Sequence, residues 1–282
     1  MPNTHDYHRP DRLEDALTTL AQGGVTVAAG CTDLFPATER KRLPGAVLDI
    51  TGIPDLGTIG MTEGGLRIGA TATWANVLAT DLPPALDGLK LAAKEIGATQ
   101  IQNQATVAGN LCNASPAADG VPPLLTLDAL VELRSTSRER NLPIGEFLNG
   151  PRQTARAADE LVTGILIPEA ALKGQAHFSK LGARKYLVIS IAMTAARVVL
   201  EGGLVTSARL AVGACGPVAT RVGAAERALI GAPLAPDAVT DAMMAEVLTP
   251  IDDVRADASY RAAAAGELMR RTLRACQAAG AV

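Results

Sequence analysis

The residues of this chain that are best suited to hold a charged ligand lie between Thr106 and Asp119, in the stretch TVAGNLCNASPAAD. Its small residues would leave backbone N–H groups open to a ligand. Asn110, Asn113 and Asp119 add two amides and a carboxylate. The apolar run at 122–130 predicts a helix, whose N-terminus would add a partial positive charge. We interpret the stretch as a turn-rich loop that cradles a phosphate-bearing ligand, with Asp119 suited to a ribose hydroxyl.

A second stretch of small residues follows a predicted strand. It consists of Ala28, Ala29, Gly30, Cys31, Thr32, Asp33 and Leu34. Taken alone, it is equally well interpreted as an ordinary turn, because short glycine loops are common. Two such loops in one chain could grip a pyrophosphate from two sides, so the pair is a stronger indication than either member.

A third element combines cations with an aromatic side chain: Lys180, Arg184, Lys185 and Tyr186. A cation here could lie near the pyrimidine end of a flavin and stabilise its reduced, anionic form. Without the two loops, a solvated basic hairpin is the simpler interpretation. Cys31 invites a nucleophile hypothesis, but no base lies near it in the sequence, so we interpret it as a small residue in a glycine-like position.

Composition excludes several classes of protein. The 282 residues carry a net charge of −3 and few aromatic side chains, which argues against a nucleic-acid partner. The N-terminus lacks the pattern of a signal peptide, and no apolar run approaches the roughly 20 residues of a membrane span, so the cytoplasm is expected by default. The four cysteines lie far apart without a CxxC pair, so we expect neither a zinc site nor an iron–sulfur cluster in this chain.

Periodicity and turn residues predict a mixture of helices and strands with a domain boundary near residue 170. A first helix is expected after Asp11, as N-cap, with Glu14 completing a capping box. Thr73 is expected to cap another. The other predicted helices are 84–96, 122–130, 221–230, 236–247 and 259–278. The predicted strands are 25–29, 47–50, 56–61, 66–70, 130–134, 138–142, 160–167, 177–181, 190–200 and 204–212, of which the last three form an antiparallel set.

Four motifs, in order along the chain, resemble the FAD-binding medium subunit of molybdenum hydroxylases. That family includes the flavin subunits of carbon monoxide dehydrogenase and bacterial xanthine dehydrogenase. The motifs are AGCTD (29–33), IGAT (68–71), TVAGN (106–110) with NASPAAD (113–119), and DASYR (257–261). The resemblance covers essentially the whole chain, and the paired loops make it specific at the level of the family.

The resemblance implies an α+β fold. A two-lobed FAD-binding domain of the vanillyl-alcohol-oxidase/PCMH type would occupy residues 1–170, with lobes of about 1–55 and 56–170. A smaller domain with a three-stranded antiparallel sheet and helices would occupy residues 171–282.

The resemblance also assigns cofactor contacts but no catalytic residue. The 28–34 loop and the 106–110 loop would hold the FAD pyrophosphate. Ser115 and Asp119 would lie along the ribose, ribityl and phosphate region, and Asn113 would be a further cofactor contact. Ile96 and Val162 would lie near the flavin ring, Lys180 would reach its pyrimidine edge, and Tyr186 would cover it. The pyrophosphate contacts of the second loop would be Thr106, Ala108, Gly109 and Asn110.

Two positions depart from the family pattern, because Cys31 and Ala108 stand where each loop usually has a second glycine. If either position requires a positive φ, the side chain costs about 1 kcal/mol or more. The chain also lacks the cysteine-rich insertion of relatives that reduce aromatic acyl-CoA thioesters, which argues against that branch.

The expected function is electron transfer through FAD to NAD⁺, a quinone or another acceptor. A small iron–sulfur subunit would supply the electrons, and a large molybdenum-cofactor subunit would hydroxylate the substrate, in a dimer of heterotrimers. Two alternatives remain open at this point. One is a self-contained FAD-dependent oxidoreductase. The other is a non-catalytic nucleotide-binding scaffold, which only the replaced glycines favour.

Overall fold

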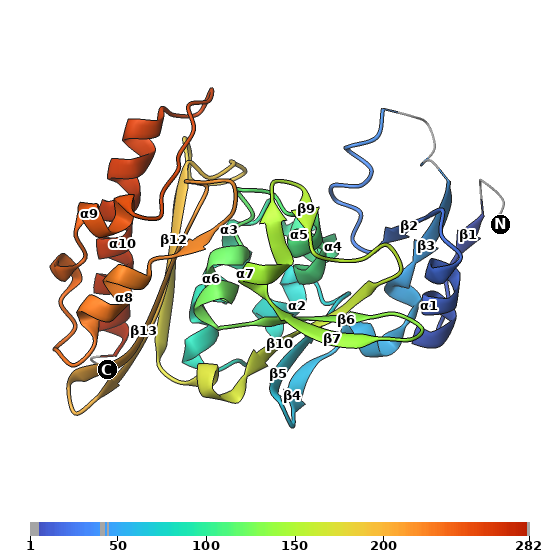
Figure 1. The fold of residues 1–282 in the computed structure, drawn as a ribbon, viewed down its shortest axis with the longest axis horizontal. Coiled ribbons are helices and arrows are strands. Elements are labelled where there is room, and N and C mark those ends of the chain that lie inside the picture. Colours follow the sequence, from blue (N-terminus) through green and yellow to red (C-terminus); the bar gives the residue numbers. More distant parts are fainter. Residues whose placement is uncertain (1–5, 40–42, 44, 281–282) are drawn as a thin grey trace.

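The computed structural model describes residues 6–39, 43 and 45–280. Three larger open sheets follow one another along the described part of the chain, with helices between and around them and a fourth, two-stranded sheet beside them (Figure 1). No helix among the described residues is long and apolar enough to cross a membrane. The mixed architecture confirms the α+β prediction.

The N-terminal sheet has the order β1-β3-β2, and both of its strand pairs are parallel. Its elements are β1 (Tyr7–His8), α1 (Leu13–Ala21), β2 (Val25–Ala28) and β3 (Ala46–Asp49). The predicted capping box of α1 is wrong. Arg12 has the extended backbone of the N-cap and makes no side-chain cap, so Asp11 lies one residue too early. The buried face of α1 contains Ala16, Leu17 and Leu20.

The central sheet has the order β4-β5-β10-β6-β7 and is antiparallel throughout. Its strands are β4 (Ile59–Thr62), β5 (Gly65–Gly69), β6 (Leu130–Arg134), β7 (Glu139–Pro143) and β10 (Leu161–Pro168). A small hairpin, β8 (Leu148–Gly150) with β9 (Gln153–Thr154), lies between β7 and β10 in the chain. The register of β10 against β6 shifts between Val162 and Gly164, which is the signature of a β-bulge.

Helices fill the chain between β5 and β6. They are α2 (Trp74–Ala79), α3 (Asp87–Glu95), α4 (Thr99–Gln104), α5 (Val107–Asn113) and α6 (Val121–Thr126). A short helix, α7 (Ile144–Phe147), follows β7. Thr73 caps α2 in a capping box with Asn76, as its position predicted. The predicted helix 84–96 is divided, because a 3₁₀ turn at Pro84–Leu86 precedes α3.

The interpretation of residues 106–119 as one loop is wrong. Residues 107–113 form α5, whose N-cap Thr106 accepts a hydrogen bond from the Gly109 amide. Gly109 and Asn110 are poor helix formers, so local propensity argued for a loop. Burial of Val107, Ala108 and Leu111 outweighs it.

The C-terminal sheet contains the three predicted antiparallel strands and a short fourth one. They are β11 (Gln175–Leu181), β12 (Ala192–Glu201), β13 (Leu204–Gly213) and β14 (Thr220–Arg221). The later helices are α8 (Gly223–Leu229), α9 (Asp241–Ala245) and α10 (Ala258–Ala279). Helix α10 packs on one side of this sheet, and α3 and α6 pack on the other (Figure 1). The sheet therefore joins the C-terminal helices to the helices around the predicted cofactor loops.

A cluster of arginines fixes the C-terminal sheet against the preceding part of the chain. Arg197, Arg209 and Arg221, on three adjacent strands, approach the Asp128 carboxylate at 3.4, 3.0 and 2.8 Å. Arg197 also donates to the Thr126 carbonyl at 2.7 Å. These bonds hold β12, β13 and β14 in place beside α6.

Glu160, immediately before β10, is a fully buried carboxylate with two arginine partners. Hydrogen bonds from Arg140, then from the Ala157 amide and Arg138, hold its pKa at about 2, although burial opposes them. A lowered pKa contributes stability above the ordinary value of the group, and this contribution is lost as the pH falls through the lowered one. We expect Glu160→Gln to lower the free energy of unfolding by about 2 kcal/mol at neutral pH, since both arginines are partly exposed and screened.

Denaturant unfolding at several pH values measures this effect. The difference between wild type and Glu160→Gln should shrink as the pH falls from about 4.5 towards 2. Glu139→Gln is the matched control, because Glu139 pairs with Arg134 at 3.4 Å while 68% exposed. Equal effects of the two substitutions would contradict the assigned role of the buried carboxylate.

Candidate cofactor site

The first predicted loop leaves the carboxyl end of β2. Ala28, the last residue of that strand, lies beside Asp49 of β3. Within the described part of the chain, no backbone acceptor pairs with the five amides from Gly30 to Leu34. Consecutive unpaired amides at the end of a parallel strand form a cradle for an anion.

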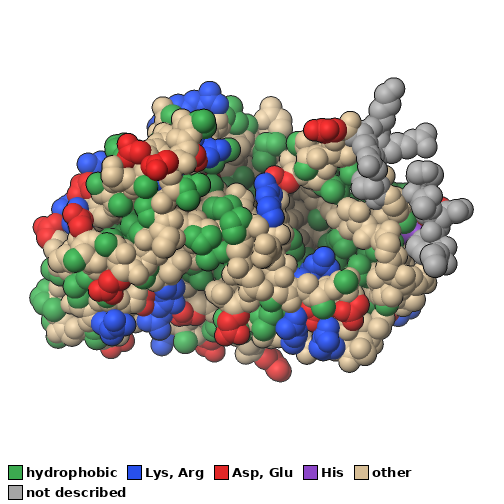
Figure 2. Space-filling view, turned by 45° about the horizontal axis from the view of Figure 1, so that its top comes forward, with side chains coloured by type: hydrophobic (Ala, Val, Ile, Leu, Met, Phe, Trp, Pro, Cys, Tyr) green, Lys and Arg blue, Asp and Glu red, His purple; other side chains and the backbone are tan. Residues whose placement is uncertain are grey.

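Gly30 brings the two predicted phosphate-binding segments together. A Cβ atom at this position would lie 2.0 Å from the Gln104 carbonyl oxygen and 2.9 Å from the Ala105 Cα. The loop therefore rests directly on the backbone that leads into α5. Figure 2 shows the molecule hollowed near its centre, between the N-terminal lobe and the rest.

Cys31 and Ala108 differ in backbone conformation. Cys31 has a φ of 58°, in the left-handed region, whereas Ala108 lies within α5 and is buried. The Cys31 thiol donates to the Ala29 carbonyl at 3.4 Å. Burial, and then the nearby Asp49 carboxylate, raise the pKa of Cys31. Its thiol is therefore protonated near neutral pH, which disfavours a role as a nucleophile.

Of the two replaced glycine positions, Cys31 is the one with a positive φ, so we expect Cys31→Gly to stabilise the protein by up to about 1 kcal/mol. FAD affinity should be unchanged or improved. Thermal unfolding and FAD titration measure the two effects. Cys31→Ala removes the thiol but keeps the Cβ, so it separates the two contributions. A loss of FAD affinity in both variants would show that the thiol itself binds the cofactor.

Two buried polar atoms near the start of α5 lack a hydrogen-bond partner among the described residues. They are Asn110 Oδ1 and Trp74 Nε1. A Cβ at Gly120 would lie 2.9 Å from Asn110 Oδ1 and 2.5 Å from the Trp74 ring. Glycine at 120 thus lets the ring and the amide pack together. An unpaired buried amide oxygen costs about 1–3 kcal/mol, and a hydroxyl donor would relieve that cost.

The end of α5 is held by the β8–β9 hairpin, which the sequence did not single out. Arg152 donates its backbone amide to the Ala114 carbonyl at 2.8 Å, and its side chain bonds the Asn113 carbonyl and side-chain oxygens. Because of these bonds from Arg152, Asn113 already has a protein partner. Ser115 closes a local turn by accepting a hydrogen bond from the Ala117 amide at 3.3 Å.

Asp119 and Lys180, predicted as separate contacts to the cofactor, form one buried ion pair. Lys180 Nζ lies 2.6 Å from Asp119 Oδ2, and their side chains are 6% and 9% exposed. Ser190 donates to the other carboxylate oxygen at 2.5 Å. Burial raises the pKa of Asp119, and Lys180 and Ser190 oppose that rise. Lys180 also donates to the Glu95 carbonyl at 3.4 Å, which places its ammonium group beside Ile96.

The remaining predicted residues differ in exposure. Val162 is 3% exposed and lies at the bulge of β10. Ile96 is partly buried against the same hydrophobic core. Tyr186 is 56% exposed in the loop between β11 and β12, with Lys185 Nζ 5.2 Å from its ring centre.

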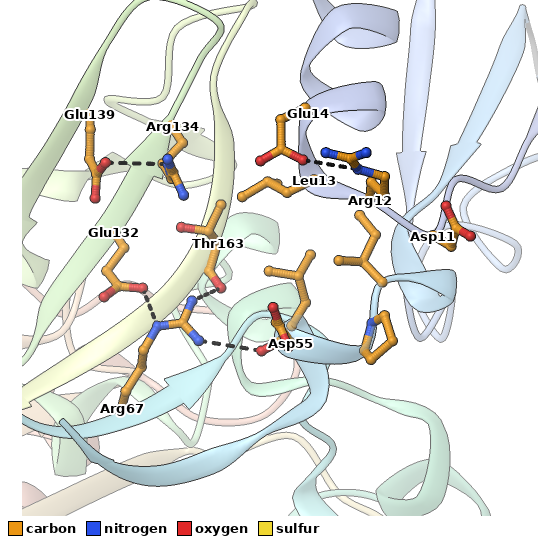
Figure 3. Close-up of a pocket in the computed structure, with 13 residues that line it drawn as sticks. Asp11, Arg12, Leu13, Glu14, Asp55, Arg67, Glu132, Arg134, Glu139 and Thr163 are labelled. Carbon is orange, nitrogen blue, oxygen red and sulfur yellow. Dashed lines mark hydrogen bonds and ion pairs between the residues drawn. The ribbon is translucent and has the colours of Figure 1, made fainter.

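A polar pocket of about 510 Å³ lies elsewhere and contains none of the predicted site residues. It is lined by the start of α1, residues 53–56 and side chains of the central sheet (Figure 3). Its charges are largely paired: Arg67 with Glu132 at 2.7 Å, Arg134 with Glu139 at 3.4 Å and Arg12 with Glu14 at 3.6 Å. Arg67 also donates to the Thr163 carbonyl at 2.7 Å. The Arg67 side chain therefore supports the β-bulge next to Val162.

No cluster of three or more metal-binding side chains occurs among the residues that the structure describes. The cysteines found there are free thiols, and burial raises the pKa of Cys215 to about 11 and that of Cys276 to about 12.

Comparison with known proteins matches the chain to two family models. Residues 3–170 match the FAD binding domain in molybdopterin dehydrogenase, and residues 153–276 match the CO dehydrogenase flavoprotein C-terminal domain. The xanthine dehydrogenase FAD-binding subunit of Escherichia coli O157:H7 is 32% identical over 90% of each chain. The nicotinate dehydrogenase FAD-subunit of Eubacterium barkeri is 33% identical over 81% of this chain and 80% of its own.

A solved structure has the same fold over nearly the whole length. It is the carbon monoxide dehydrogenase of Hydrogenophaga pseudoflava that lacks the Mo-pyranopterin moiety of its molybdenum cofactor. One of its chains superposes with a TM-score of 0.87 and 28% identity, with 99% of both chains covered. These matches confirm the resemblance inferred from the sequence motifs. The chain belongs to the family of FAD-binding subunits of molybdopterin-dependent dehydrogenases.

Proposed function

We propose that this chain is the electron-transfer subunit of a molybdenum hydroxylase and binds FAD between the 28–34 loop and the start of α5. The observation that carries this placement is the contact of Gly30 with the Gln104 carbonyl, which joins the two segments into one cradle. Asn113, Ser115 and Asp119, which follow along the chain, are further proposed contacts.

The residues present fit FAD. Five amides without a backbone acceptor suit the pyrophosphate, because an anion needs several converging N–H donors. The unpaired Asn110 oxygen suits a hydroxyl donor of the ribityl or ribose part. Lys180 supplies a positive charge where the pyrimidine edge is proposed to lie, while Ile96 and Val162 supply apolar contacts for the ring.

Bound FAD would supply the redox chemistry, accepting electrons and passing them to NAD⁺, a quinone or another acceptor. The protein holds the cofactor through backbone amides, excludes water from its ring with aliphatic side chains, and sets the local charge through Lys180 and Asp119.

The partner subunits belong to the same proposal. We infer that a small iron–sulfur subunit delivers the electrons, that a large molybdenum-cofactor subunit oxidises the organic substrate, and that two such trimers associate in the cytoplasm. Support comes from the relatives, which are described as FAD subunits of dehydrogenases.

Purification of the tagged chain from its native host tests this assembly. We expect two further chains, with iron and molybdenum, in constant ratio to the flavin. The isolated flavin-loaded chain should not oxidise an organic substrate. Substrate oxidation by the isolated chain would support a self-contained oxidoreductase instead. Partners without any flavin would support the scaffold alternative.

A further inference from the structure

The loop between β11 and β12 is pinned at both ends to a single carboxylate. Lys180 lies near the end of β11, and Ser190 lies two residues before β12. Their side chains bond different oxygens of Asp119, at 2.6 Å for Lys180 Nζ and 2.5 Å for Ser190 Oγ. The base of the loop is closed by the Ile191 amide, which donates to the Leu181 carbonyl at 2.8 Å.

Burial makes the arrangement of these three groups rigid. Ser190 is 1% exposed and Asp119 is 7% exposed, so water cannot readily replace either hydrogen bond. A carboxylate with one partner can rotate about its χ2 torsion, which is broad for Asp. With a different donor on each oxygen, its plane is fixed, and so is the position of the ammonium group of Lys180.

We propose that Ser190 is a positioning residue for the cofactor: its hydroxyl orients Asp119, and Asp119 in turn holds Lys180 and offsets its charge beside the flavin. This inference rests on the proposed function, because that function places Lys180 at the pyrimidine edge. No sequence motif pointed to Ser190.

The sign of the effect follows from the charges. A cation near the flavin favours its reduced state, and a neighbouring carboxylate offsets that cation. Among the described residues, Lys180 of β11 is the ionisable side chain that affects the pKa of Asp119, and Ser190 is a neutral hydrogen-bond donor to it. At the end of α3, the Glu95 carbonyl accepts a hydrogen bond from Lys180. Loss of the Ser190 hydrogen bond raises the pKa of Asp119. As the pH falls, Asp119 is then protonated earlier, at a higher pH than in wild type, and no longer offsets the charge of Lys180.

The test measures the midpoint potential of the bound flavin against pH in the flavin-loaded full chain. In Ser190→Ala, the potential should be more positive than in wild type on the acid side. Protonation of Asp119 produces a step in the plot of flavin potential against pH. The pH at the midpoint of this step should be about one unit higher in Ser190→Ala than in wild type, the equivalent of one hydrogen bond. At high pH the two profiles should meet. Ser190→Cys keeps a weaker donor, so its midpoint pH should shift in the same direction by a smaller amount. This variant keeps the test available if Ser190→Ala does not fold.

Two further variants make the result specific. Ser179→Ala is the matched control, because Ser179 is adjacent to Lys180 but its hydroxyl accepts from Thr272 of α10 at 2.8 Å, so its profile should match wild type. Lys180→Met should make the potential more negative and abolish the effect of Ser190→Ala.

The outcomes separate the inference from the function beneath it. A Ser190→Ala profile equal to wild type, with a shifted Lys180→Met, overturns the role of Ser190 and leaves the proposed function standing. A Lys180→Met profile equal to wild type would show that Lys180 does not lie beside the flavin. It would overturn both the proposed place of Lys180 at the pyrimidine edge and the role of Ser190 that depends on it. A full chain that binds no flavin contradicts the proposed function itself.

Discussion

Replacing Gly30 by alanine is expected to weaken FAD binding by roughly 10- to 100-fold and to destabilise the fold by about 1–3 kcal/mol. The added Cβ would lie 2.0 Å from the Gln104 carbonyl oxygen, so backbone must move. The movement would separate the 28–34 loop from the start of α5. FAD titration and chemical unfolding measure the two effects.

Gly60→Ala is the control for this substitution. A Cβ at Gly60, in β4, would meet no atom within 4 Å, so stability and FAD affinity should stay close to wild type. If Gly30→Ala bound FAD as tightly as Gly60→Ala, the close contact between the two segments would be irrelevant to cofactor binding. The 28–34 loop and the start of α5 would then not form one cofactor site.

Replacing Asp119 by alanine is expected to cost about 3–5 kcal/mol of stability and to weaken FAD binding. The Lys180 side chain is only 6% exposed, so the substitution leaves its ammonium group buried without a carboxylate partner. The sequence suggested a contact to ribose alone, and the ion pair adds the structural cost.

A second substitution separates the two roles of Asp119. Asp119→Ala combined with Lys180→Met removes both charges and should regain much of the lost stability, while FAD binding stays weak. Asp237→Ala is the control for an exposed pair, because Asp237 is 81% exposed beside Arg274 and its loss should cost less than about 1 kcal/mol. Equal stability losses for Asp119→Ala and Asp237→Ala would contradict the buried ion pair.

Much of the fold could be predicted because its elements carry local signals. Two strand-length runs on either side of the turn residues 201–203 predicted β12 and β13. The long apolar stripe of α10 and the Thr73 cap of α2 were sufficient for those helices. Helix α4 was missed because its sequence, TQIQNQ, has a single large apolar side chain. Strand β1 spans two residues, which is too short for any periodicity.

The candidate site was predictable in its segments but not in its contacts. Gly30 and the 106–119 stretch stand out by composition, whereas the contacts of Ser190 with Asp119 and of Arg152 with Asn113 span 71 and 39 residues. A single serine or arginine carries no local sign of such a partner. The pairing of Asp119 with Lys180 likewise depends on how the C-terminal sheet packs beside α6.

The most direct test of the account is the absorption spectrum of this chain, purified from its native host and set against its protein concentration. We expect one FAD for each chain, with broad iron–sulfur absorption added when the partner subunits are retained. A chain that carries no flavin, and takes up none when FAD is added, would contradict it.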